Sequence, residues 1–169
     1  KKAIKINPEY AQAYNNLGCA YEELGNKKDA LNNFKIATKI KPNYAEAYNN
    51  LGMVFCDLAK FNESLLSYNK AININPTYEK AYNNIGNLFN NLGKYDEATK
   101  AYYKAIKIKP DYAKAYSNLL FNLNYKNNFD PDLYLSEAKN FALNCKNNNK
   151  KFSFKHEYQK NPTKLRIGL

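Results

Sequence analysis

The sequence is poor in the residues that most often build metal, redox and nucleic-acid sites. It has one histidine, three cysteines, no tryptophan and, among 26 basic residues, a single arginine, Arg166. Cys19, Cys56 and Cys145 form neither a CxxC pair nor a metal-ligand spacing, so we predict no metal site and no disulfide framework, and we expect a reducing compartment. No apolar run approaches the roughly 18 residues of a membrane span. We therefore expect a cytoplasmic location (nucleocytoplasmic if eukaryotic) and no membrane partner.

The net charge of +11 is the strongest bias that remains. Lysine and asparagine are both abundant, as in proteins from AT-rich genomes, and we interpret the charge as this compositional bias. Nucleic-acid binding through a basic surface stays an alternative, but the single arginine argues against it. His156, the one histidine, is interpreted as a solvated side chain. The chain starts with Lys1 rather than Met, and we expect its N-terminus to be a cut.

A period of 34 residues organises the first two thirds of the chain. Prolines recur at Pro8, Pro42, Pro76 and Pro110, and tyrosines at Tyr14, Tyr48, Tyr82 and Tyr116. A fixed period of this size indicates stacked supersecondary units. We predict the end of a preceding repeat at 1–10, full repeats at 11–44, 45–78 and 79–112, a partial repeat with a capping helix at 113–145, and a linker at 146–169.

Each repeat is predicted to contain two helices. In the first repeat, Tyr14, Leu17, Gly18 and Tyr21 share one helical face, and a turn at Gly25 precedes a second helix that ends before Pro42. This pattern resembles the tetratricopeptide repeat. The resemblance implies an all-α fold, a solenoid of helix-turn-helix units wound into a right-handed superhelix with a capping helix and an extended tail. Ala59 stands in place of the turn glycine, and we expect it to lengthen the preceding helix by one residue.

The C-terminal part departs from the period. Asp130-Pro131 is typical of a helix start, and we predict a capping helix over 131–145 whose apolar face is formed by Tyr134, Ala138, Phe141, Ala142 and Cys145. The last residues, 164–169, are predicted to begin a strand.

Residues 113–169 resemble the junction in O-GlcNAc transferases and Spindly-like proteins, on the segments at 117–125 (SNLLFNLNY), 130–132 (DPD), 137–138 (EA) and 164–168 (KLRIG). The resemblance implies that a catalytic region lies beyond Leu169 and that the parent protein is a protein O-linked glycosyltransferase using a nucleotide sugar. The 169 residues themselves then bind acceptor polypeptides, hold no cofactor and contain no catalytic residue.

One stripe of the first helices is distinct from their packing face. It includes an asparagine in every repeat, at Asn16, Asn50, Asn84 and Asn118, and these four match the asparagine ladder that holds the polypeptide backbone in the groove of O-GlcNAc transferases. A carboxamide can donate to a peptide C=O and accept from a peptide N–H. We predict a peptide-binding groove on the concave side that comprises the four asparagines together with Gln12, Glu46, Lys80, Lys114 and Asn87. A structural interpretation, in which the asparagines only brace their neighbours, stays open.

A free-standing scaffold or co-chaperone-type interaction module is the alternative function. The clamp that such modules use for a C-terminal carboxylate needs five polar residues, of which Asn50 and Lys80 match. Asn15, Cys19 and Asn84 stand where lysine, asparagine and a basic residue are required.

Overall fold

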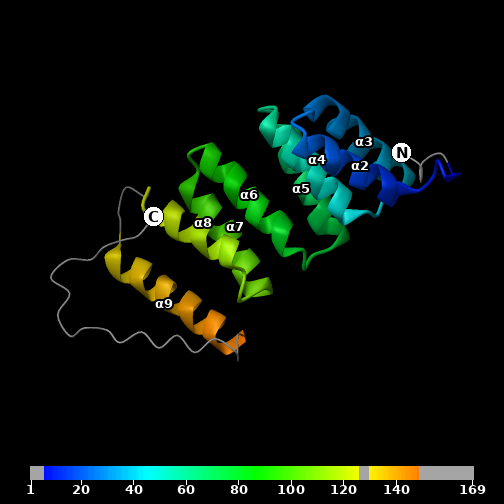
Figure 1. Ribbon diagram of the computed structural model, residues 1–169. Helices are drawn as coiled ribbons and strands as arrows, with labels where there is room; N and C mark the ends of the chain where they lie inside the picture. The colour runs from blue at the N-terminus through cyan, green and yellow to red at the C-terminus, as the bar shows by residue number, and fades with distance from the viewer. Residues whose placement is uncertain (1–5, 126–129, 149–169) are drawn as a thin grey trace.

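The computed structural model describes residues 6–125 and 130–148, and every regular element in these residues is a helix. The helices are α2 (Ala11–Glu23), α3 (Lys27–Ile40), α4 (Ala45–Asp57), α5 (Phe61–Ile74), α6 (Glu79–Asn91), α7 (Tyr95–Ile108), α8 (Ala113–Leu123) and α9 (Pro131–Asn148). They follow one another in pairs along the molecule (Figure 1), and each second helix packs against its own first helix and the first helix of the next repeat. The predicted all-α repeat solenoid is confirmed. None of the described helices is both long and apolar enough to cross a membrane.

A glycine allows the two helices of each repeat to approach closely. A Cβ atom on Gly18 would lie 2.6 Å from the ring of Phe34, and one on Gly52 would lie 2.6 Å from the ring of Tyr68. Gly86 meets the ring of Tyr102 in the same way. These rings are buried, so they cannot swing away from an added methyl group. The glycine and the aromatic residue sixteen positions later therefore form one packing unit that recurs with the period.

The turn at Ala59 corrects the expectation that helix α4 would be longer. Helix α4 has 13 residues, as do α2 and α6, and Ala59 adopts a left-handed conformation with φ of 56°. Gly25 and Gly93 do the same with φ of 73° and 70°. The Ala59 amide donates to Cys56 O and the Lys60 amide to Phe55 O, both at 2.9 Å. These two closing bonds hold the alanine in the glycine conformation despite its Cβ atom.

Replacement of Ala59 by glycine should therefore stabilise the protein. A left-handed alanine costs about 1–2 kcal/mol, and part of that gain is offset because glycine loses more entropy on folding. We expect a net increase of about 0.5–1 kcal/mol in the free energy of unfolding, measured by urea denaturation. Gly93→Ala is the matched control. It should lower stability by a similar amount, because the alanine must adopt a left-handed conformation. Nothing lies within 4 Å of the added Cβ, so no steric clash adds to this cost. A loss of stability in Ala59→Gly would contradict this interpretation of the turn.

Helix α9 covers the last described repeat. Its N-terminus is capped by Asp130, whose Oδ1 atom accepts from the amides of Asp132 and Leu133 at 3.0 Å. The Phe141 ring lies 4.9 Å from that of Tyr116, and Asn144 Nδ2 donates to the hydroxyl of Tyr116 at 3.0 Å.

The prediction of a capping helix is confirmed, with two differences. Helix α9 continues to Asn148, and Ala142 is exposed rather than on the packing face. Leu120 occupies the position at which the preceding repeats have glycine, and Ser136, sixteen positions later, stands where they have an aromatic residue. The predicted strand at 164–169 and His156 lie outside the described residues.

Candidate functional site

The first helices α2, α4, α6 and α8 lie in a row, because each contacts the next first helix along the chain. The predicted asparagines Asn16, Asn50, Asn84 and Asn118, here called the ladder asparagines, all belong to these helices. The surface that carries them is called the ladder face. Asn16 is exposed and the other three are half-buried.

A second set of asparagines holds the ladder in place. Asn50 Nδ2 donates to Asn15 Oδ1 at 3.0 Å, and Asn84 Nδ2 donates to Asn49 Oδ1 at 3.0 Å. Asn118 Nδ2 donates to Asn83 Oδ1 at 2.9 Å. The acceptors Asn15, Asn49 and Asn83, here called the inner asparagines, are at most 3% exposed. Each hydrogen bond joins neighbouring repeats, so Asn50, Asn84 and Asn118 do brace the repeats against one another.

Bracing leaves the carbonyl oxygen unused in two of the ladder amides, those of Asn84 and Asn118. No described residue donates to Oδ1 of Asn84 or Asn118. Asn50 Oδ1 accepts only a long bond of 3.4 Å from Asn49, and Asn16 Oδ1 accepts from Gln12 at 3.2 Å. In Asn84 and Asn118 the Nδ2 atom fixes the plane of the amide, and the carbonyl oxygen remains free to accept. A carbonyl oxygen in this position can bind the N–H of an extended peptide.

The other predicted site residues divide into two groups. Glu46, Lys80 and Lys114 are exposed, and none of the three makes an ion pair with a described residue. Gln12 and Asn87 are engaged internally, because Gln12 Oε1 accepts from the hydroxyl of Tyr44 and Asn87 Oδ1 accepts from that of Tyr102. We therefore expect the charged side chains, rather than these two amides, to contact a ligand directly.

Negative charge gathers at the N-terminal end of the ladder face. Burial raises the pKa of the Glu22 carboxyl, and the nearby charges of Asp57 and Glu23 raise it further. Burial followed by the charges of Glu22 and Glu46 raises the pKa of the Cys19 thiol. Burial also raises the pKa of the Cys56 thiol. Both thiols therefore stay protonated near neutral pH and are poor nucleophiles there.

Aromatic side chains occupy the C-terminal end of the same face. Phe121 and Tyr125 are 53% and 52% exposed, and their ring centroids lie 4.8 Å apart. Tyr125 follows the register of Glu23, Asp57 and Asn91, so the spacing could have revealed it, and sequence reasoning missed it. The inner asparagines were also missed, although the repeated Tyr-Asn-Asn triplet contains them.

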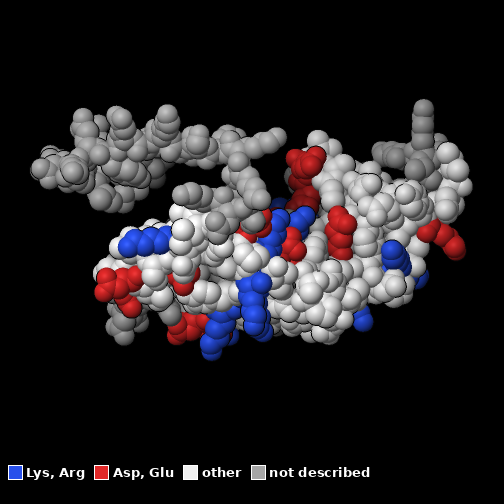
Figure 2. Space-filling model, turned by 90° about the horizontal axis from the view of Figure 1, so that it is seen from below, with Lys and Arg blue, Asp and Glu red and all other residues white. Residues whose placement is uncertain are grey.

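On the face that Figure 2 shows, the basic side chains of the described residues do not form one continuous surface. In Figure 2, lysine side chains stand in small separate groups among acidic ones, and much of the visible face carries no charge. Nucleic-acid binding depends on a stripe of positive charge that follows the phosphates. The face shown in Figure 2 lacks such a stripe among its described residues.

Family models establish the class of this protein. Tetratricopeptide repeat models match residues 1–32, 23–58, 53–93 and 79–112, which together span residues 1–112 without a gap. The chain belongs to the tetratricopeptide repeat proteins. No curated protein matches it.

Solved structures share the fold. A crystal structure of MamA is 28% identical with a TM-score of 0.69, over 89% of this chain and 85% of MamA. The first tetratricopeptide domain of Spaghetti (RPAP3), bound to the HSP90 peptide SRMEEVD, is 24% identical with a TM-score of 0.64, over 68% of this chain and 90% of that one. A mutant of the Thermobaculum terrenum O-GlcNAc transferase is 20% identical with a TM-score of 0.72, over 79% of this chain and 26% of the transferase.

Proposed function

We propose that this chain binds an extended segment of a partner protein on the ladder face, with main-chain N–H groups of the partner donating to the ladder asparagines. The observation that carries the proposal is the pair of free Oδ1 atoms on Asn84 and Asn118, whose amides are oriented by the inner asparagines. Each such bond contributes about 0.5–1.5 kcal/mol, so several in a row give useful affinity. Binding of this kind selects extended backbone rather than a particular sequence.

The two ends of the ladder face favour particular side chains in the bound peptide. The acidic side chains near Cys19 favour a basic residue of the partner at the N-terminal repeats. Phe121 and Tyr125 offer an exposed aromatic surface for an apolar residue at the last repeat. The charges and the rings thus give a bound peptide a preferred direction.

We further propose that the chain is the acceptor-binding arm of an O-GlcNAc-transferase-like glycosyltransferase of the cytoplasm or nucleocytoplasm, with its nucleotide-sugar site in a catalytic region beyond Leu169. Support comes from the ladder asparagines and from the junction resemblance of residues 113–169. The likeness to the Thermobaculum terrenum enzyme is one of fold. Sequencing the parent transcript tests this directly. Two Rossmann-like domains after Leu169 are expected, and a stop codon within a few residues would contradict the glycosyltransferase proposal.

The alternative is a scaffold that clamps a C-terminal carboxylate, and the geometry disfavours it. Asn15, which stands where the clamp needs lysine, is fully buried and accepts a hydrogen bond from Asn50. It supplies no positive charge, and Asn84 supplies none either.

Fluorescence polarisation with labelled peptides separates these functions. We expect an uncharged, unstructured peptide to bind the 169-residue chain equally well with a free or an amidated C-terminus. A large preference for the free carboxylate would favour the clamp, and absence of any peptide binding would contradict the proposed function. An RNA probe of equal length serves as a further control, and we expect it to bind more weakly at physiological salt.

A further inference from the structure

The residue one turn before each ladder asparagine lies beside it on the ladder face. In the first repeat this is seen directly, because Gln12 Nε2 donates to Asn16 Oδ1 at 3.2 Å. The same position, here called the flanking position, is occupied in the next three repeats by Glu46, Lys80 and Lys114. All three side chains are exposed. The charge beside the ladder asparagines therefore changes sign between Glu46 and Lys80.

The first helices as a whole follow the same change of sign. Helices α2 and α4 contain acidic residues but no basic one, and the acidic residues are Glu22, Glu23, Glu46 and Asp57. Helices α6 and α8 contain Lys80, Lys114 and one carboxylate, Glu79. Glu79 is about 100° of helix rotation from Lys80 and so lies off the ladder stripe. Two first helices without a basic residue run against the bias of the whole chain, which has 26 basic and 15 acidic residues.

The acidic side chains of α2 and α4 lie close to the ladder. Asn50 Nδ2 is 3.5 Å from Cys19 Sγ. After burial, the causes that raise the pKa of the Cys19 thiol are three nearby carboxylates, those of Glu22, Glu46 and Glu23. None of these three makes an ion pair with a described residue, whereas Asp57 pairs with Lys27 of α3 at 3.6 Å. The N-terminal half of the ladder face therefore carries unpaired negative charge.

We propose that the segment bound on the ladder face has segregated charges, with basic residues lying against α2 and α4 and acidic residues against Lys80 and Lys114. This inference rests on the function proposed above, because it names the chemistry of the segment whose main chain the ladder asparagines hold. A segment with charges of one sign would be repelled by one half of the face. A segment with separated charges is attracted along its whole length, and the charges fix its register on the repeats.

The test compares three peptide probes of equal length by fluorescence polarisation with the 169-residue chain. The first probe is neutral. The second carries lysines near one end and glutamates near the other, and it is made in both chain directions. The third has the composition of the second, but its lysines and glutamates alternate. At low salt we expect the better segregated probe to bind about fivefold or more tightly than the alternating probe, and we expect the difference to shrink at high salt.

The probes separate this inference from the function on which it rests. If the neutral probe binds but the segregated and alternating probes have equal affinities, the ladder holds main chain without selecting charge, and the inference is wrong. If none of the probes binds, the proposed function is contradicted together with the inference.

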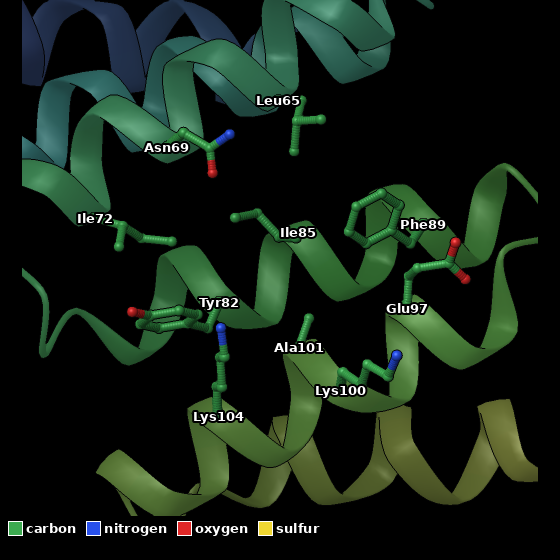
Figure 3. Close-up of a pocket in the computed structure, with 10 residues that line it drawn as sticks. All are labelled: Leu65, Asn69, Ile72, Tyr82, Ile85, Phe89, Glu97, Lys100, Ala101 and Lys104. Atoms are coloured by element: carbon green, nitrogen blue, oxygen red, sulfur yellow. The ribbon is translucent and has the colours of Figure 1, made fainter.

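An exchange of two flanking charges locates the effect. Glu46→Lys combined with Lys80→Glu keeps the net charge but breaks the segregation, so the preference for the segregated probe should fall to about twofold or less. Glu97→Lys combined with Lys100→Glu is the matched control. Figure 3 shows both of these side chains at a pocket between α5, α6 and α7, and its lining residues among those described include no ladder or flanking residue. The control exchange should leave the preference unchanged.

Two results with the variants would overturn the inference. If the preference survives the exchange at Glu46 and Lys80, the ladder face does not select the charges of the segment. If the control exchange removes the preference as well, it follows the overall charge of the chain rather than the ladder face. Circular dichroism of both variants confirms that they are folded.

Discussion

Truncation of Tyr102 to alanine should lower the free energy of unfolding by about 3–5 kcal/mol, the range seen when a large buried aromatic side chain is removed. Tyr102 is 1% exposed, and its ring packs against Gly86 in the facing helix. Loss of the ring opens a cavity between α6 and α7. Gly86 has no side chain that could fill it. The Asn87 carbonyl also loses the Tyr102 hydroxyl that donates to it at 2.9 Å. Urea denaturation followed by circular dichroism measures the loss.

Tyr102→Phe separates the ring from the hydroxyl. Phenylalanine occupies the same position in the first repeat, at Phe34, so the ring alone is compatible with this packing. We expect a loss of only about 1 kcal/mol, the net contribution of one hydrogen bond. If Tyr102→Ala cost no more than Tyr102→Phe, the glycine–aromatic contact would not be the main contact between the two helices.

Substitution of Asn84 and Asn118 together by alanine should weaken peptide binding about fivefold or more. Two lost hydrogen bonds correspond to about 1–3 kcal/mol if each contributes 0.5–1.5 kcal/mol. The double variant also loses the bonds to the inner asparagines Asn49 and Asn83, so its stability should fall. Binding must therefore be measured well below the unfolding transition, by fluorescence polarisation with a neutral peptide.

Matched controls distinguish binding from stability. Asn32→Ala with Asn62→Ala removes two exposed asparagines from the second helices and should change neither property. Asn16→Ala removes the ladder asparagine that bonds no inner asparagine, so it should weaken binding with little loss of stability. Equal affinities for the wild-type chain and both ladder variants would leave bracing as the only role of these residues.

The repeat period predicted the fold because packing residues recur in phase. Gly18 packs against Phe34, and a glycine packs against a tyrosine at the same positions of the next two repeats. The prediction for the turn at Ala59 was wrong because two backbone hydrogen bonds close the turn and hold the alanine in the left-handed conformation of the glycines.

The candidate site was predicted only in part. The ladder asparagines stand out by recurrence, but their partners lie 35 residues away, one more than the period, so the pairing of Asn84 with Asn49 is not visible in the aligned repeats.

The affinity of an N-methylated peptide tests most directly whether the ladder face binds main chain. A neutral peptide is compared with the same sequence carrying N-methyl groups at alternate residues, which removes N–H donors and keeps every side chain. If the free carbonyl oxygens of Asn84 and Asn118 accept from the peptide backbone, N-methylation should weaken binding about tenfold or more, and the Asn84→Ala/Asn118→Ala variant should no longer distinguish the two peptides. Equal affinity of the two peptides for the wild-type chain would contradict backbone recognition by the ladder.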